Sequence, residues 1–303
     1  MVNASDFVAE IIRIYQQGCG YIWGTYGQLW TEALQKKGSK ENNAKTQAYG
    51  RQWLGYNVYD CSGMPYAVLK KLGLSIPHGC NSIWKNGYLS EKGKTSALPM
   101  KKRLPGMPVF LTTGDNRHHM GTYIGGGWCI EAKGTQTGVV ISKWEHWDEA
   151  GYYRGMDYNL PYDWELPEFH FDIYPPINGF STCRSGYSGA SVRYVQVLLR
   201  DRWSDDITVD NYYGSATIAA VKAFQEAHRL DVDGVVGPLT IAALEKELPI
   251  GVEPDRVPVQ PPDTPAPAWA ETVQQLQTLM GQNADNLERM RQMVNALDYM
   301  KEG

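Results

Sequence analysis

A cysteine that precedes a predicted helix is the residue of this sequence best suited to act as a nucleophile. The run Asp60-Cys61-Ser62-Gly63 comes directly before residues 64–72, whose apolar side chains recur at helical spacing. At a helix N-terminus the unpaired backbone N–H groups and the positive end of the helix dipole favour thiolate over thiol. The pattern therefore predicts that Cys61 is a reactive thiol and not only a small apolar residue of the core.

A histidine and a glutamate in the next part of the chain are predicted to meet on one face of a β-hairpin. Residues 118–124 and 128–132 read as two strands joined by three glycines. Opposed residues in such a hairpin have numbers that sum to about 250 to 252, so His119 is predicted to face Glu131 to within about a residue. Strand alternation points His118 to the other face. His119 is thus the predicted base, with Glu131 as its orienting acceptor.

These residues resemble the NlpC-type cell-wall peptidases, a papain-like family, over about 150 residues. The motifs that carry the resemblance are Gly20-Tyr21-Ile22-Trp23-Gly24, Asp60-Cys61-Ser62-Gly63, and His119-x-Gly-x-Tyr-Ile-Gly with a polar residue twelve positions after the histidine. The resemblance implies an α+β fold, in which a helix bearing the nucleophile packs on a small antiparallel sheet bearing the base.

The resemblance also implies a role for each site residue. Cys61 is the expected nucleophile, His119 the base and Glu131 the orienting residue, with no metal and no cofactor. The residues expected to shape the substrate pocket are Tyr21, Asp60 and Ser62. Asp60 could also simply cap the helix that follows it, and the two roles can hold together.

The sequence departs from the family pattern at three places. Glu131 stands where histidine is frequent, Met107 stands where aspartate is usual, and about 36 residues separate Gly24 from Asp60. The insertion is expected to reshape the substrate cleft. The expected activity is a cysteine endopeptidase that cuts the stem peptide of peptidoglycan after D-glutamate, through an acyl-enzyme. An N-acetylmuramoyl-L-alanine amidase and a non-catalytic wall-binding or assembly protein are the alternatives.

A repeat with a period of 23 residues marks a second, smaller domain. Asp210, Gly214 and Thr217 recur as Asp233, Gly237 and Thr240, and each copy reads as a turn followed by a helix. With a further helix over 192–199, the two copies predict a small all-α bundle. The half-motif Asp-Gly-x-x-Gly-x-x-Thr, at residues 233–240, resembles the helical peptidoglycan-binding module. That resemblance implies a domain that holds the hydrolase on the wall.

The C-terminal part of the chain predicts a spacer and a single long helix. Seven of the 17 prolines fall within 249–267, which favours an extended linker. Residues 268–303 follow a heptad stripe with one polar interruption at Asn283, which predicts a coiled coil and a homo-oligomer. Folding of this helix onto its own hydrolase domain is the alternative. The predicted organisation is: 1–158 hydrolase domain, 159–189 linker, 190–248 wall-binding domain, 249–267 linker and 268–303 helix.

Composition narrows the classes of partner. The formal net charge is only −4, so neither nucleic acid nor an anionic lipid surface is an expected partner. No stretch approaches 18 uninterrupted apolar residues, and the N-terminus lacks the pattern of a signal peptide. The five scattered cysteines argue against a disulfide framework or a zinc site. Cytoplasmic synthesis followed by release to the wall, as for a phage endolysin, is the expectation that fits these features.

Overall fold

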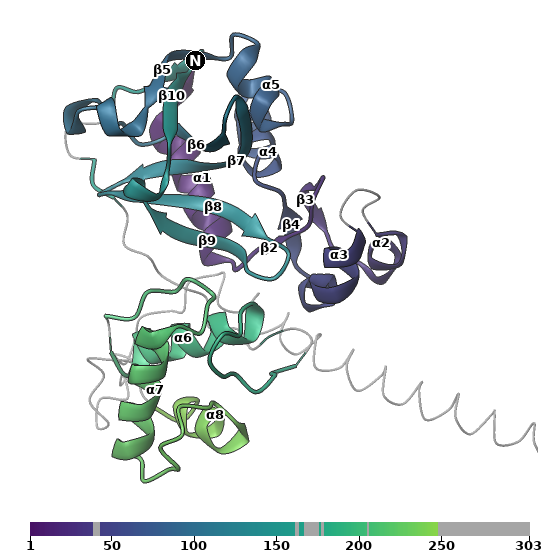
Figure 1. Cartoon of the computed structure of the whole chain (residues 1–303), viewed down its shortest axis with the longest axis vertical. Coiled ribbons are helices and arrows are strands. Elements are labelled where there is room, and N and C mark those ends of the chain that lie inside the picture. Colours follow the sequence, from purple (N-terminus) through teal and green to yellow (C-terminus); the bar gives the residue numbers. More distant parts are fainter. Residues whose placement is uncertain (39–42, 161–163, 167–175, 177–178, 205, 248–303) are drawn as a thin grey trace, which may run out of the picture. The chain divides into compact units, whose positions relative to one another are not determined.

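The structure is a computed structural model that describes residues 1–38, 43–160, 164–166, 176, 179–204 and 206–247 (Figure 1). The chain divides into two compact units, Met1–Val252 and Glu253–Gly303. The predicted spacer 249–267 and the predicted coiled-coil helix 268–303 lie outside the described residues. The predicted hydrolase and wall-binding domains both belong to the first unit.

A six-stranded antiparallel sheet forms the centre of the first domain, in the order β5-β10-β6-β7-β8-β9. In chain order these strands are β5 (Leu89–Lys94), β6 (Pro108–Thr113), β7 (Asn116–Gly125), β8 (Trp128–Gly134), β9 (Gly138–Lys143) and β10 (Glu149–Tyr153). The strands β7 and β8 match the predicted hairpin, with Gly125 ending one and Trp128 beginning the other. The predicted α+β fold with an antiparallel sheet is confirmed.

Three helices position the site, and two of them, α1 and α5, pack on this sheet. Helix α1 (Ala4–Gln16) packs against β7, β8 and β9 through buried side chains that recur at three and four residues, among them Phe7, Ile11 and Ile14. Helix α4 (Gly63–Leu72) packs on α1, and α5 (Cys80–Lys85) packs against β7. Each buried large apolar side chain contributes about 1.5–3 kcal/mol to folding. The ends of α4 and α5 are thereby held close to the middle of β7.

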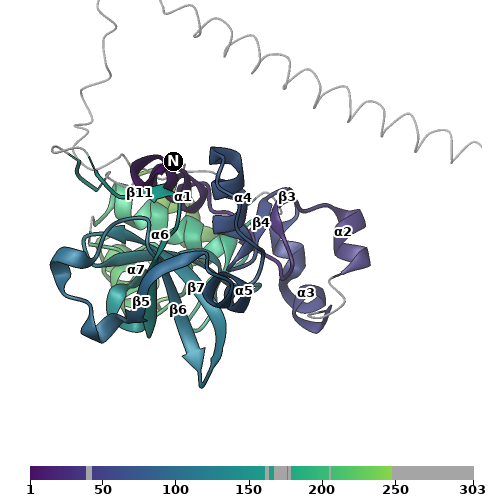
Figure 2. The same ribbon diagram turned by 90° about the horizontal axis from the view of Figure 1, so that it is seen from above.

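A second, three-stranded sheet leads the chain into the site, in the order β2-β4-β3. Its strands are β2 (Gly20–Tyr21), β3 (Tyr26–Leu29) and β4 (Asn57–Tyr59). The predicted insertion lies between them and contains α2 (Glu32–Lys37), α3 (Asn43–Tyr49) and the 3-10 helix η1 (Gly50–Trp53). In both views α2 and α3 lie beyond β3 and β4, on the side away from the six-stranded sheet (Figures 1 and 2). The strand β4 ends one residue before Asp60.

Short elements complete the first domain. The strands β1 (Val2–Asn3) and β11 (Met156–Asp157) pair in parallel, so the two ends of the domain meet. The 3-10 helices are η2 (Thr95–Ala97), η3 (Met100–Lys102) and η4 (Trp144–His146). The last of these ends directly before Trp147, which lies two residues ahead of β10.

The helices of the second domain are α6 (Ala190–Arg202), α7 (Ser215–Ala227) and α8 (Pro238–Leu244). They enclose a core of their own, which includes Leu198, Phe224 and Val236. The helices α7 and α8 begin directly after Gly214 and Gly237, as the repeat predicts. The predicted all-α domain is confirmed. Cys183 pairs with Val236, so the backbone joins this domain before residue 190.

A buried glutamine holds each turn of the repeat. The Gln196 side chain donates to the Asp210 carboxylate (2.7 Å) and to the Thr217 hydroxyl (3.0 Å), and it accepts from the Asn211 N–H (2.8 Å). Gln225 makes the same three kinds of bond in the second copy, to Asp233, Thr240 and Gly234. Gln196 precedes Asp210 by 14 residues, whereas Gln225 precedes Asp233 by 8 residues. The two glutamines are therefore not related by the 23-residue period of the repeat.

The helical domain contacts the first domain within the same compact unit. The buried Tyr15 hydroxyl of α1 donates to the Val209 carbonyl at 2.7 Å. The Asn211 side chain donates to the Thr137 carbonyl at 2.9 Å. Asn211 has the left-handed φ of +59°, where the second copy of the repeat has Gly234. Asparagine tolerates this conformation and adds an amide that reaches the neighbouring domain.

Candidate active site

The backbone between β4 and α4 is held by one carboxylate. Asp60 Oδ1 accepts from the N–H groups of Ser62 (3.0 Å) and Gly63 (2.7 Å), while Oδ2 accepts from the Gly24 N–H (2.8 Å). A side chain on Gly63 would overlap the Thr25 carbonyl oxygen, so glycine is required there. This arrangement places the partly exposed Cys61 immediately before α4.

His119 and Glu131 lie together, as predicted. The distance between His119 Nε2 and Glu131 Oε2 is 2.6 Å, and Glu131 is 1% exposed. The register of β7 and β8 pairs Thr122 with Ile130, so the opposed numbers sum to 252. Continuing this register sets Glu131 opposite Gly121, and His119 is its diagonal neighbour on the same face. The observed sum of 252 lies within the predicted range of about 250 to 252, and the offset of two residues between His119 and Gly121 preserves the face because side chains alternate with period two.

A tryptophan supports the imidazole from the other side. The Trp147 ring stacks on His119, with ring centroids 5.6 Å apart and planes 16° apart. A Cβ atom on Gly121 would lie 2.8 Å from the Trp147 ring, so glycine leaves room for the stack. Trp144 and Trp147 are each 2% exposed, so both pack internally and neither offers a platform to a ligand.

The thiol of Cys61 is acidic, for a reason that the sequence did not reveal. A hydrogen bond from the Cys80 thiol, whose Sγ lies 3.7 Å from Cys61 Sγ, is the largest cause. Burial opposes ionisation, and hydrogen bonding with His119 favours it, so that the pKa of Cys61 falls to about 5. The first N–H groups of α4 donate to the Asp60 carboxylate, whose charge raises the pKa of Cys61. Cys80 and His119, not free helix N–H groups, therefore stabilise the thiolate.

The imidazole of His119 is correspondingly basic. Burial lowers its pKa, but the hydrogen bonds with Cys61 and Glu131 outweigh burial and raise the pKa to about 9. Burial would also raise the pKa of Glu131, yet its bond to His119 keeps that pKa below the ordinary value. Because Nε2 binds Glu131, Nδ1 is the nitrogen left for Cys61. At neutral pH the three groups therefore form a thiolate, an imidazolium and a carboxylate.

Comparison with known families agrees with this geometry. The NlpC/P60 family model matches residues 37–153, and the model of a peptidoglycan binding domain matches residues 188–244. This chain carries an NlpC/P60 domain and a peptidoglycan-binding domain. The resemblance predicted from the motifs is confirmed, and the matched segment of the NlpC/P60 domain contains Cys61, His119 and Glu131.

Individual relatives are more distant. The uncharacterized protein in the bpoA1 3′ region of Kitasatospora aureofaciens is 48% identical over 46 residues, which are 15% of this chain and 39% of that protein. The chain thus spans about two fifths of the length of that curated relative. Among solved structures, the NlpC/p60 domain of the peptidoglycan hydrolase SagA is 21% identical, with a TM-score of 0.33, and the match covers 50% of this chain and 98% of that one. The peptidoglycan hydrolase RipB of Mycobacterium tuberculosis is 24% identical, with a TM-score of 0.31, over 46% of this chain and 59% of that one.

The three residues predicted to bind substrate lie beside the thiol of the NlpC/P60 domain but are largely buried. Tyr21 is 8% exposed, and Asp60 and Ser62 are each 4% exposed. Burial raises the pKa of Tyr21, and the charges of Cys61 and Asp60 raise it further, which places the phenol near both. The Ser62 hydroxyl donates to Asp60 Oδ1 at 3.1 Å. Asp60 thus caps the following helix, the simpler of its two predicted roles.

A second histidine of the NlpC/P60 domain lies at the site but was not predicted from the sequence. His78 Nε2 lies 2.8 Å from each oxygen of Asp60, and its ring stacks on Tyr66 with centroids 5.8 Å apart. The hydrogen bond to Asp60 raises the pKa of His78. His78 lies in the irregular segment before α5, where no period relates one residue to another. Only the fold brings it to the site.

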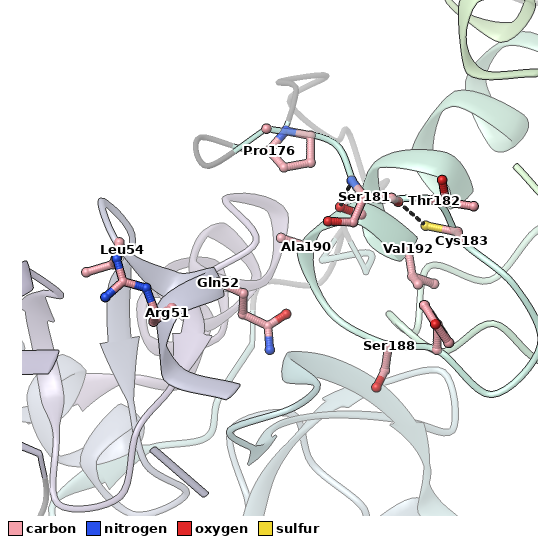
Figure 3. A pocket seen from close by; sticks show the side chains of 13 residues that line it. Arg51, Gln52, Leu54, Pro176, Ser181, Thr182, Cys183, Ser188, Ala190 and Val192 are labelled. Atoms are coloured by element: carbon pink, nitrogen blue, oxygen red, sulfur yellow. Dashed lines mark hydrogen bonds between the residues drawn. The ribbon is translucent and has the colours of Figure 1, made fainter. Parts of the chain in front are cut away.

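A separate hollow of about 520 Å³ lies where the insertion meets the segment before α6 (Figure 3). Its walls include Gln52, Ser181, Cys183 and Ser188. The Cys183 thiol donates to the Ser181 carbonyl at 3.2 Å, and burial raises the pKa of Cys183 to about 12. Cys183 is therefore a neutral thiol near pH 7, and none of the predicted site residues lines this hollow.

Two kinds of feature are absent from the described part of the chain. No helix there is long and apolar enough to cross a membrane. No group of three or more histidine, cysteine, aspartate and glutamate side chains there is placed to hold a metal ion.

Proposed function

We propose that this protein is a peptidoglycan hydrolase in which Cys61 attacks an amide carbonyl of the stem peptide. The observation that carries the proposal is the contact of a partly exposed, acidic thiol with an imidazole that is bonded to a buried carboxylate. The match to the NlpC/P60 family over the segment that contains all three residues supports the same chemistry.

The reaction needs only the groups already in place. The Cys61 thiolate adds to the carbonyl carbon, and the His119 imidazolium gives its proton to the departing amine, which leaves an acyl-enzyme thioester. Neutral His119 then takes a proton from water as the water attacks the thioester, and collapse of the tetrahedral intermediate releases the acid product and the Cys61 thiolate, which restores the ion pair with the His119 imidazolium. Glu131 fixes the ring through Nε2 and stabilises the imidazolium, while the Trp147 stack restricts ring rotation.

The bond cut is proposed to be the one after D-glutamate, which makes the protein an endolysin-like endopeptidase. Tyr26, the first residue of β3, is 52% exposed and makes edge contact with His78, at a ring distance of 6.1 Å. An exposed aromatic ring in contact with His78, which itself binds Asp60 next to the nucleophile, can support a peptide chain. The domain at 188–244 is proposed to hold the enzyme on the wall and so raise its effective concentration there.

Analysis of digested peptidoglycan tests both levels of the proposal. Purified walls are incubated with the full-length protein, and the new termini are identified by mass spectrometry. A new amino group on the residue after D-glutamate supports the endopeptidase. Release of intact stem peptides with a free L-alanine amino group would replace it with the amidase. No new terminus, with wall binding retained, would leave a non-catalytic wall-binding protein.

A further inference from the structure

A second thiol lies against the proposed nucleophile. Cys80 opens α5, 19 positions after Cys61, and the two Sγ atoms are 3.7 Å apart. The other cysteines, Cys19, Cys129 and Cys183, are at most 2% exposed. All five cysteines belong to the described residues, and Cys61–Cys80 is the one sulfur–sulfur contact among them.

We propose that Cys61 and Cys80 form a reversible disulfide when the site meets a hydroperoxide, and that this bond switches the enzyme off. Cys80 is then a redox modification site, whose partner is the nucleophile itself. The inhibitory effect rests on the proposed function, whereas formation of the bond does not.

The two cysteines differ in the way that such a reaction requires. Cys61 is partly exposed and carries the thiolate, so a peroxide reaches it first. Cys80 is 7% exposed and stays protonated, because its bond to the Cys61 thiolate and its burial both raise its pKa. Once Cys61 is oxidised to the neutral sulfenic acid, the negative charge that opposed attack by Cys80 has gone.

The steps balance with hydrogen peroxide as the oxidant. The Cys61 thiolate breaks the O–O bond and takes one oxygen, and the other leaves as water with the proton of the His119 imidazolium. The Cys80 thiol then attacks the sulfenic sulfur, a bond forms between the two Sγ atoms, and the second oxygen leaves as water after taking the thiol proton. A dithiol reductant reverses the bond and is itself oxidised.

The local structure allows the sulfur atoms to close the remaining gap. A disulfide needs an Sγ–Sγ distance of about 2.05 Å, so the atoms must approach by about 1.7 Å. Cys80 begins a helix of six residues, and Gly79 before it has a φ of +123°. Rotation of the Cys80 side chain, with a small shift of this start of α5, is the movement that brings the two Sγ atoms together.

Cys80 thereby also protects the nucleophile. A sulfenic acid without a neighbouring thiol goes on to the sulfinic acid, which dithiols do not reduce. With Cys80 in contact, the sulfenic acid is consumed by disulfide formation. Recovery after oxidation thus separates a resolving thiol from one that only fills space.

Peroxide titration of the full-length protein is the test, with peptide mass spectrometry after trapping of free thiols. We expect a peptide pair joined through Cys61 and Cys80, lighter by two hydrogen atoms, and a loss of wall hydrolysis of roughly tenfold or more that dithiothreitol restores. In Cys80→Ser, which keeps a hydrogen-bond donor, we expect Cys61 to gain two oxygen atoms and dithiothreitol to restore nothing. Cys183→Ser, at a buried thiol of the helical domain, is the matched control and should behave as the wild type.

The outcomes separate this inference from the proposed function. Oxidation of wild-type Cys61 to the sulfinic acid, with no joined peptide, would overturn the inference even in an active hydrolase. Restoration of Cys80→Ser by dithiothreitol would also overturn it. A joined peptide in a protein that hydrolyses no wall when reduced would uphold the disulfide and reject the proposed function.

Discussion

In the NlpC/P60 domain the Asp60 carboxylate accepts backbone N–H groups from two elements, and in the helical domain Gln196 and Gln225 each bridge a turn and a helix. Both devices use a buried polar side chain to fix loop geometry. The first holds an acidic thiol and a basic imidazole at a partly exposed edge. The second is duplicated, is centred on a neutral amide and presents no reactive group. The first domain therefore carries the reactive groups, and the second maintains a fixed shape. Substitutions in the first should affect catalysis, and substitutions in the second should affect wall binding.

Removal of the nucleophile should have the largest effect on hydrolysis and leave the helical domain unaffected. Cys61→Ala should lower the rate of wall hydrolysis by on the order of 10⁴ or more, because no other group can form the acyl-enzyme. The measurement is release of new amino termini from purified walls. Wall co-sedimentation and the unfolding midpoint should stay close to those of the wild type. Appreciable hydrolysis by Cys61→Ala would reject the assignment of the nucleophile.

Neighbouring histidines provide a matched pair for the base. His119→Ala should lower kcat by roughly 10³, because proton transfer to the departing amine is lost. His118→Ala, on the exposed face of the same strand, should change kcat by less than about twofold. Steady-state hydrolysis of a soluble stem-peptide fragment measures both. A larger effect at His118 than at His119 would contradict the assignment of the base.

Strand alternation explains why the pair His119 and Glu131 could be predicted, since period two keeps the face even when the register shifts by two residues. The role of Cys61 could also be predicted from the sequence, because a cysteine directly before an amphipathic run is a recognisable local pattern. Cys80 and His78 had none, because their roles depend on how the segment before α5 folds back over Asp60. Cys80 is buried, as a small core residue would be, but its contact with Cys61 exists only in three dimensions.

The acidity of the site predicts a plateau of activity against pH. The reactive pair needs the Cys61 thiolate, which forms above its pKa of about 5, and the His119 imidazolium, which persists below its pKa of about 9. We expect kcat/KM to be maximal between these values, falling about tenfold per pH unit on either side. The measurement is the pH profile of hydrolysis of the soluble fragment. A profile that rises through pH 9 would show that neutral His119 is the working form.

Glu131→Gln refines this profile. The variant removes the charge that helps to raise the pKa of His119, so the alkaline limb should move to lower pH while a hydrogen-bonding side chain remains. An unchanged alkaline limb would mean that another group sets it.

The smallest expected effect comes from a substitution in the helical domain that weakens wall binding. Gln225→Ala removes an amide that bonds Asp233, Thr240 and the Gly234 N–H, and the buried Thr240 and Gly234 lose this partner. The free energy of unfolding of the helical domain should fall by about 2–3 kcal/mol. Hydrolysis of insoluble walls should drop by roughly tenfold as co-sedimentation weakens, whereas hydrolysis of the soluble fragment stays at the wild-type rate. Glu226→Ala, at the adjacent exposed position of α7, is the control and should leave all three measurements unchanged.

Equal loss on soluble and insoluble substrates would mean that the glutamine bridges support the NlpC/P60 domain itself. The contacts of Tyr15 with Val209 and of Asn211 with Thr137 are the route by which such coupling would act.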